Sequence, residues 1–432
     1  MSGLRSLTLA VPPGEEGRNN LPRPLGWALR KQDGENRAGF CGVFMNASVE
    51  ALQVAHRAPL APAPTPEMVV REGMLEVPGE VTLYHGGRLT GIRIAWRLAG
   101  PANAPVVCAL GGISANRRVF VTEDPKQGWW SEVVGPGQAL DAECFRILSF
   151  DYLGGSADST GPRSASAASP RSADIPGLHS ASTAGPHIAA FPAQAPHDVA
   201  VAEVNAPFPN ISTYDQAELL LRLINNLGIK SLRAIVGGSY GGMVALAFGE
   251  RYPERVSRLI VIGAADRTHP MSTAWRSVQR RILRFAVECG RPKDGLQLAR
   301  ALAMSTYRSS EEFEARFDGL PTRDDERFTF PVEKYLFARG SDFAERHSPE
   351  GVLCLSESID LHQVDATRIF VPTTIVAIRE DQLVPLTDLR GLAARLPVAK
   401  LHEISSIYGH DAFLKESDQL RGIFTAALGG AA

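Results

Sequence analysis

The stretch Val236-Gly-Gly-Ser-Tyr-Gly-Gly-Met243 decides how the rest of this 432-residue sequence is interpreted. Before it, Ser231–Val236 is a short apolar run of strand type, and after it Met243–Tyr252 places apolar side chains on one side of a helix. The sequence therefore predicts a strand-to-helix turn with Ser239 at its apex. The glycines two positions before and after Ser239 carry no Cβ that could collide in this crowded turn, so we expect a strained serine with an exposed hydroxyl, as in a nucleophile elbow.

Two backbone amides near this serine are expected to form an oxyanion hole. The amide of Tyr240 points with the N-terminus of the helix toward the serine. A second donor is expected from Gly112 or Ile113, because the buried strand Ala104–Leu110 ends in a double glycine that lets a backbone N–H approach a reacting carbonyl closely. A plain β-turn without a chemical role is the alternative there.

A serine nucleophile needs a base and an acid, and both follow strands near the C-terminus. Arg379-Glu-Asp381 comes after the apolar strand Phe370–Ile378, and His410 comes after the strand Val398–Ile404. The order serine, Asp381, His410 is the order of an elbow hydrolase, so His410 is predicted as the base and Asp381 as the residue that orients it. Glu380 is the competing acid.

Strands and helices alternate through most of the chain, with fully apolar strands. This pattern predicts an α/β fold with a mostly parallel sheet covered on both faces, preceded by a β-hairpin at 79–97. Ser212 or Thr213 is expected to cap a helix that runs through Gln216–Leu227. Between the last strands the pattern changes to helices without intervening strands, which predicts an inserted helical lid. The predicted organisation is a low-order extension at 1–75, the first part of an α/β-hydrolase core at 76–267 with a low-complexity insertion at 163–205, the lid at 268–361 and the second part of the core at 362–432.

Composition excludes several classes of partner. The formal net charge is −2, and no basic run is interleaved with aromatic residues, so nucleic acid is not an expected partner. No apolar run is long enough for a membrane span, the first residues lack the order of a signal peptide, and the five cysteines are scattered, so a cytoplasmic protein with reduced thiols is expected. His179, His187 and His197 lack the spacing of metal ligands, and no metal is predicted.

From about Gly79 to Phe424 the sequence resembles the homoserine O-acyltransferases of the α/β-hydrolase superfamily. The motifs that carry the resemblance are Gly128-Trp-Trp130, Gly135-Pro-Gly137, Ser159-Thr-Gly-Pro162, Phe208-Pro-x-Ile211, Gly238-Ser-Tyr-Gly-Gly-Met243, Asp381-Gln-Leu with Pro385, and Tyr408-Gly-His-Asp-Ala-Phe-Leu414. The resemblance implies a homodimer that moves an acyl group from acyl-CoA to the hydroxyl of homoserine, early in methionine synthesis, through an acyl-Ser239 intermediate and without a resident cofactor.

The resemblance also implies how the substrates are recognised. An arginine on the first lid helix binds the amino-acid carboxylate in that family, which indicates Arg280 with Arg276 as second choice, unless this is only a solvated basic face. Asp411 is expected to meet the ammonium group. Succinyl users tend to carry an arginine two positions after the catalytic aspartate; this chain has Leu383 there, which favours acetyl-CoA, although Arg276 or Arg281 could serve a succinyl carboxylate.

Other functions stay open at this point. The acceptor could be serine, the donor could be succinyl-CoA, and the same triad could serve a serine esterase that uses water. A binding module on an inactive hydrolase scaffold is a further alternative. The segment Gly111-Gly112 with Asn116 also departs from the family, which normally has threonine and histidine in this region.

Overall fold

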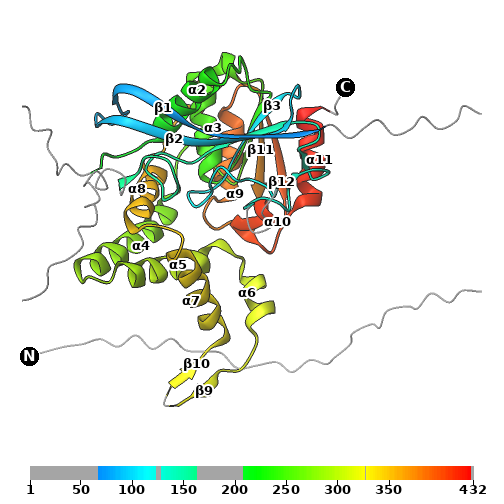
Figure 1. Cartoon of the computed structure of the whole chain (residues 1–432). Coiled ribbons are helices and arrows are strands. Elements are labelled where there is room, and N and C mark those ends of the chain that lie inside the picture. The colour runs from blue at the N-terminus through cyan, green and yellow to red at the C-terminus, as the bar shows by residue number, and fades with distance from the viewer. Residues whose placement is uncertain (1–66, 123–127, 163–207, 326, 430–432) are drawn as a thin grey trace, which may run out of the picture. The chain divides into compact units, whose positions relative to one another are not determined.

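The computed structural model describes residues 67–122, 128–162, 208–325 and 327–429, all of which belong to one compact unit, Pro64–Ala432. Within these residues one large sheet has the strand order β1-β2-β6-β3-β7-β8-β11-β12 (Figure 1). Its strands are β1 (Met68–Thr82), β2 (Arg88–Pro101), β6 (Arg146–Phe150), β3 (Val106–Leu110), β7 (Ala234–Gly238), β8 (Leu259–Ile262), β11 (Thr373–Ile378) and β12 (Ala399–Ile404).

The sheet is parallel from β6 to β12, and the hairpin β1–β2 is attached antiparallel to β6. This arrangement, with helices between the parallel strands, confirms the predicted α/β-hydrolase fold. Because the carboxyl ends of parallel strands meet at one edge, the loops after β3, β7, β11 and β12 are brought together there.

The hairpin begins earlier than predicted. The expectation of regular structure from about Glu76 is wrong, since β1 starts at Met68 and pairs with β2 from the register Met68–Pro101 onward. Most of the side chains of the first β1 residues are exposed, so this part of the strand is held by backbone hydrogen bonds and lacks apolar alternation. Residues 1–66 and the predicted insertion at 163–205 lie outside the described residues.

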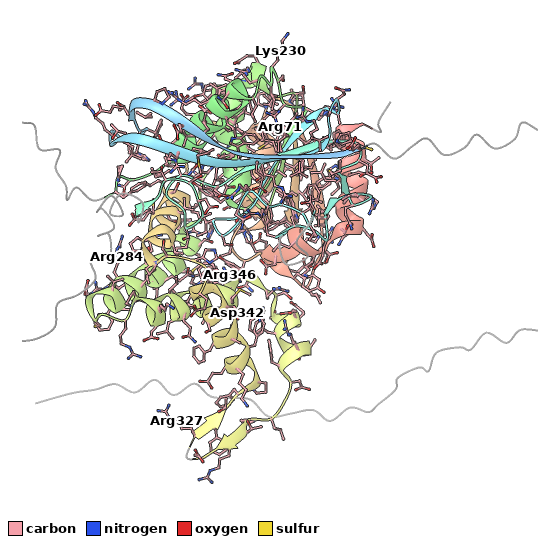
Figure 2. The ribbon with its side chains drawn as sticks, in the orientation of Figure 1. Arg71, Lys230, Arg284, Arg327, Asp342 and Arg346 are labelled. Atoms are coloured by element: carbon pink, nitrogen blue, oxygen red, sulfur yellow. The ribbon has the colours of Figure 1, made fainter. Side chains whose placement is uncertain are left out.

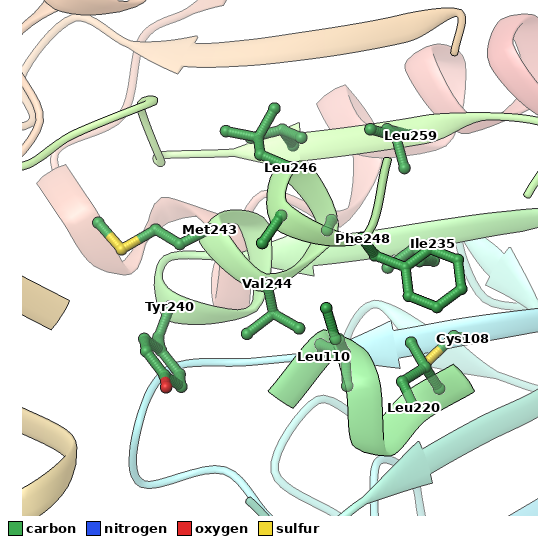
Figure 3. Packing of buried hydrophobic residues seen from close by; sticks show 14 of the residues in the cluster. Cys108, Leu110, Leu220, Ile235, Tyr240, Met243, Val244, Leu246, Phe248 and Leu259 are labelled. Carbon is green, nitrogen blue, oxygen red and sulfur yellow. The ribbon is translucent and has the colours of Figure 1, made fainter. Parts of the chain in front are cut away.

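Two hydrophobic clusters lie on opposite faces of the sheet, as the side-chain alternation of β7 requires: Ile235 belongs to one cluster and Val236 to the other. Helices α2 (Thr213–Asn226), α3 (Tyr240–Arg251) and α9 (Leu386–Arg395) cover the first face, and α10 (Ala412–Lys415) and α11 (Ser417–Leu428) the second. Figure 3 shows Val244 and Leu246 of α3 together with the strand residues Leu110, Ile235 and Leu259 of the first cluster. This burial fixes the helix that follows Ser239.

Helix α2 begins where the sequence predicts. Ser212 is its N-cap, and the Ser212 hydroxyl accepts from the amide of Asp215 while the Asp215 carboxylate accepts from the amide of Ser212. This is a capping box, so the predicted cap at Ser212 or Thr213 is confirmed for Ser212.

Five α-helices lie between β8 and β11 in the chain, as far as the described residues extend: α4 (Pro270–Glu288), α5 (Pro292–Tyr307), α6 (Ser310–Phe317), α7 (Pro331–Ala344) and α8 (Pro349–Asp360). In Figure 1 they gather on one side of the sheet, and Figure 2 draws charged side chains on them, such as Arg284 of α4 and Asp342 of α7. The prediction of no strands here is wrong. A two-stranded ribbon of β9 (Thr322–Asp324) and β10 (Arg327–Thr329) interrupts the helices, and three-residue strands are too short to show a periodic pattern.

Among the described helices, none has the length and apolar character needed to cross a membrane.

Candidate active site

Ser239 lies in the strained turn that the sequence predicts between β7 and α3. Its φ and ψ are 54° and −123°, a backbone conformation that a side chain with a Cβ rarely adopts. A Cβ on Gly237 would fall against the backbone of Gly241, and a Cβ on Gly241 would fall against the backbone of Leu110, so both glycines are required where the helix approaches the strands. The amide of Ser239 donates to the carbonyl of Ile262 at 2.9 Å, which fixes the turn to β8.

The structure brings the three predicted triad residues together. Nε2 of His410 lies 2.8 Å from Oγ of Ser239, and Nδ1 of His410 lies 2.7 Å from Oδ2 of Asp381. The carboxylate of Asp381 is fully buried, and the His410 side chain is almost so. With Nδ1–H donating to Asp381, Nε2 is free to accept the hydroxyl proton of Ser239.

Asp381 is held by three donors. Besides His410, the amides of Leu383 and Val384 donate to its Oδ1 at 2.8 and 3.0 Å. Glu380 points elsewhere, because its carboxylate accepts from the hydroxyl of Ser405 and, at 2.8 Å, from the amide of Ser406. Of the two candidate acids, only Asp381 stands behind the imidazole.

The surroundings of His410 raise its basicity. Burial alone would lower the pKa of His410, but the carboxylates of Asp381 and Asp411 outweigh it, and the pKa lies above the ordinary value for histidine. Arg276 opposes this increase only weakly. The imidazolium that forms when His410 takes a proton is thus stabilised by two carboxylates.

The residues predicted to supply the oxyanion donors lie next to Ser239, either directly after it in the chain or in the same hollow. Tyr240 is the first residue of α3, so its amide has no acceptor within the helix. Gly112 and Ile113 both line the hollow that contains Ser239 and His410. The amide of Gly241 donates to the carbonyl of Gly111 at 2.9 Å, which ties the elbow helix to the turn after β3.

Two tryptophans connect the loops of the site, a role that the sequence motif did not reveal. Nε1 of Trp129 donates to the carbonyl of Asn116 at 2.8 Å, and Nε1 of Trp130 donates to the carbonyl of Phe413 at 2.6 Å. Trp130 is buried, and its neighbour stacks on it with ring centroids 5.0 Å apart. The pair joins the loop of the oxyanion donors to the loop of His410.

The lid closes a pocket over Ser239. On the side of the lid, the pocket is lined by apolar residues together with arginines from α4 and α5. On the side of the sheet, it is lined by Ile113, Ser239, Met243, Gly263, Leu383, Val384 and His410. A site covered in this way limits the access of water to the serine.

Arg276 and Arg280, the predicted carboxylate ligands, both line this pocket. They share a partner that the sequence does not indicate: Arg276 Nη2 lies 2.6 Å from Oδ1 of Asp360, and Arg280 Nη1 lies 2.6 Å from its Oδ2. Two guanidinium groups beside one carboxylate leave an excess of one positive charge. Burial acts to raise the pKa of Asp360, but the two arginines hold it below its usual range.

Asp411 is placed differently from what the substrate prediction assumed. It lines the hollow at Ser239, but its carboxylate already pairs with Arg308, whose Nε lies 3.0 Å from Oδ2. A substrate ammonium would have to share Asp411 with Arg308. Arg281 does not line the pocket. It is exposed, and its Nη1 lies 3.5 Å from Oε1 of Glu288.

Leu383 is buried and lines the same pocket as Ser239. Its carbonyl accepts from the hydroxyl of Ser272 on α4 at 2.6 Å, which links the acid loop to the lid. Among the described residues no group of three His, Cys, Asp or Glu side chains is arranged to hold a metal ion, and His179, His187 and His197 lie outside that part of the chain.

Comparison with known proteins agrees with this architecture. The sequence profile of the alpha/beta hydrolase fold matches residues 105–417. The chain is 36% identical over 373 residues to a homoserine O-succinyltransferase of Xanthomonas campestris, which covers 86% of each chain. It is 34% identical over 316 residues to a homoserine O-acetyltransferase of Thermus thermophilus, which covers 70% of this chain and 72% of the relative. A crystal structure of homoserine O-acetyltransferase from Bacillus anthracis matches with a TM-score of 0.68 at 18% identity, over 84% of this chain and 98% of that one.

Proposed function

The chain belongs to the homoserine O-acyltransferases of the alpha/beta hydrolase fold, and on that basis we propose that it transfers an acyl group from acyl-CoA to the hydroxyl of L-homoserine. The observation that carries the proposal is the position of His410, within hydrogen-bonding distance of Ser239 on one side and Asp381 on the other. This arrangement supplies an activated serine nucleophile.

The first half of the reaction acylates Ser239. Its Oγ attacks the thioester carbon while Nε2 of His410 takes the hydroxyl proton, and the amides of Tyr240 and of Gly112 or Ile113 stabilise the oxyanion. The carbon–sulfur bond then breaks, and the proton on Nε2 passes to the departing thiolate. The products are acyl-Ser239 and the free thiol of CoA.

The second half uses the same groups in reverse order. The hydroxyl of homoserine gives its proton to Nε2 of His410 as its oxygen attacks the acyl carbon, and Ser239 leaves and regains that proton. The lid pocket favours this acceptor over water because it covers the serine. The carboxylate of homoserine would bind at Arg280 and Arg276, which retain an excess positive charge beside Asp360, and its ammonium would approach Asp411.

Several finer points belong to the proposal. The enzyme acts in methionine biosynthesis as a cytoplasmic homodimer, with no resident cofactor and with acyl-CoA as a substrate. The neutral Leu383 favours an acetyl donor, whereas relatives of this chain bear both acetyl and succinyl names.

One assay tests the function. Release of free CoA thiol is followed with acetyl-CoA and succinyl-CoA, each combined with L-homoserine, L-serine or no amino acid. We expect steady thiol release only when homoserine is present, with a single-turnover burst without it. Steady release that is independent of any amino acid would identify a hydrolase and overturn the proposal, and faster turnover with serine would reassign the acceptor.

A further inference from the structure

Arg300 is a cation of the active site that the proposed reaction does not yet use. It lies on α5 and lines the lid pocket, as do Arg276 and Arg280. It also lines the second hollow at Ser239, which contains the oxyanion residues Gly112 and Ile113; the two arginines of α4 do not. Arg300 is therefore the arginine that both hollows at the nucleophile share.

Aromatic rings hold the guanidinium of Arg300. Its Cζ lies 5.1 Å from the ring centroid of Tyr307 and 4.7 Å from that of Phe343. The Tyr307 ring in turn lies 5.8 Å from the ring of His410. Cation–π contacts orient a guanidinium without neutralising its charge, so its N–H donors stay available to an anion.

The other pocket arginines differ in their charge balance. Arg276 and Arg280 share Asp360, whereas in the described part of the chain no carboxylate pairs with Arg300. Arg267 also lines the lid pocket, but it is exposed and does not reach the hollow of the oxyanion residues. A half-buried cation without a carboxylate, next to the site of acylation, is suited to an anionic group of a substrate.

We propose that Arg300 is a specificity-determining residue that binds a carboxylate at the far end of the acyl chain, so that the preferred donor carries a dicarboxylic acyl group. This inference rests on the proposed function and refines its donor. The α-carboxylate of the acceptor already has the excess positive charge of the Arg276 and Arg280 pair. Arg300, on the oxyanion side, meets the acyl group that is bound to Ser239. The neutral Leu383 then no longer argues against a succinyl donor, because Arg300 on α5 supplies the cation instead.

The experiment isolates the donor half-reaction. Acylation of Ser239 is measured by rapid-quench mass spectrometry without any amino acid, using succinyl-CoA and butyryl-CoA, which differ mainly in carboxylate versus methyl at the chain end. The variants are Arg300→Met, which keeps a long side chain that packs against aromatic rings, and Arg300→Lys, which keeps the charge. Arg281→Met is the matched control outside the pocket.

Wild type should prefer succinyl-CoA over butyryl-CoA, and Arg300→Met should lower that preference by about 10- to 100-fold, the range of a hydrogen bond to a charged group. Arg300→Lys should keep part of the preference and Arg281→Met all of it. A preference that persists in Arg300→Met would overturn the assignment. So would an equal slowing of acylation by both donors, which would indicate that Arg300 binds the phosphates of CoA. Unchanged acylation together with a raised KM for homoserine in steady-state thiol release would assign Arg300 to the acceptor and would also overturn the proposal.

Failure of the underlying function gives a different result. If wild type is acylated by acetyl-CoA but shows no preference for succinyl over butyryl, only the role of Arg300 is lost. If no acyl-CoA acylates Ser239, the proposed acyltransferase is itself wrong, and the inference falls with it. Thermal unfolding of each variant separates loss of fold from loss of preference.

Discussion

Glu380 and Asp381 are adjacent in the chain, yet their carboxylates have separate partners: Asp381 accepts from His410, and Glu380 accepts from Ser405 and Ser406. The two residues therefore form a natural matched pair. Asp381 is buried against the imidazole, while Glu380 holds the start of the loop that carries His410. Substitution of Asp381 tests the orientation of the His410 imidazole, whereas substitution of Glu380 tests the support of the loop that carries His410.

Asp381→Asn should lower kcat by about 10⁴-fold, because the amide cannot hold the tautomer that leaves Nε2 free to accept a proton. Glu380→Gln should cost less than about tenfold, since an amide still accepts from Ser405 and Ser406. Steady-state thiol release with both variants checks this. Comparable losses in the two would contradict the assignment of Asp381 as the orienting acid.

Ser239 is predicted to react with a fluorophosphonate probe. The hydroxyl lies 2.8 Å from Nε2 of His410, so it is activated even without substrate. Labelling should disappear in Ser239→Ala and fall strongly in His410→Ala. Persistent labelling of Ser239→Ala would show that another residue reacts, and an unlabelled wild type would favour an inactive scaffold.

The pH dependence of acylation should reflect the raised pKa of His410. Only the neutral imidazole accepts the serine proton, so kcat/KM for acyl-CoA should rise with pH and level off above a pKa that is higher than the ordinary value near 6.5. Asp411→Asn removes one carboxylate that raises this pKa. It should therefore shift the rising part of the kcat/KM profile to lower pH. An unchanged pH profile in Asp411→Asn would show that Asp411 does not raise the pKa of His410.

Arg280→Ala should raise the KM for homoserine, because the excess charge beside Asp360 is lost. Loss of a charged contact to the amino-acid carboxylate costs about 2–5 kcal/mol. Burst acylation of Ser239 by acyl-CoA without the acceptor should be affected much less. The control Arg281→Ala changes an exposed arginine on the same helix, and equal KM values in the two variants would remove Arg280 from the acceptor site.

Asp360→Asn should destabilise the lid. The carboxylate is mostly buried and pairs with two arginines, so its loss leaves two guanidinium groups close together and costs about 3 kcal/mol, at the low end for breaking a buried pair. Glu288→Gln, which breaks the exposed pair with Arg281, should change stability by less than about 1 kcal/mol. Chemical denaturation compares them, and equal midpoints would show that the Asp360 cluster does not stabilise the fold.

Features of this protein that depend on local pattern could be predicted from the amino-acid sequence. Ser239 at a glycine-rich turn between an apolar strand and a helix indicated the elbow, and the order of Ser239, Asp381 and His410 at strand ends indicated which groups converge. These inferences succeed because parallel strands bring the residues after their carboxyl ends to one edge. The cap at Ser212 followed in the same way from a short-range motif.

The contacts between side chains across the lid could not be predicted from the sequence. Asp360 lies 84 residues after Arg276 in the chain, and no spacing rule pairs them. The same holds for Arg300, whose guanidinium lies over the ring of Phe343 on α7, and for Trp130, which reaches the carbonyl of Phe413. Such contacts depend on how helices pack and in which direction each side chain points, and periodicity along one element does not specify these. The choice between Glu380 and Asp381 was also tertiary, because adjacent residues in a loop point to different partners.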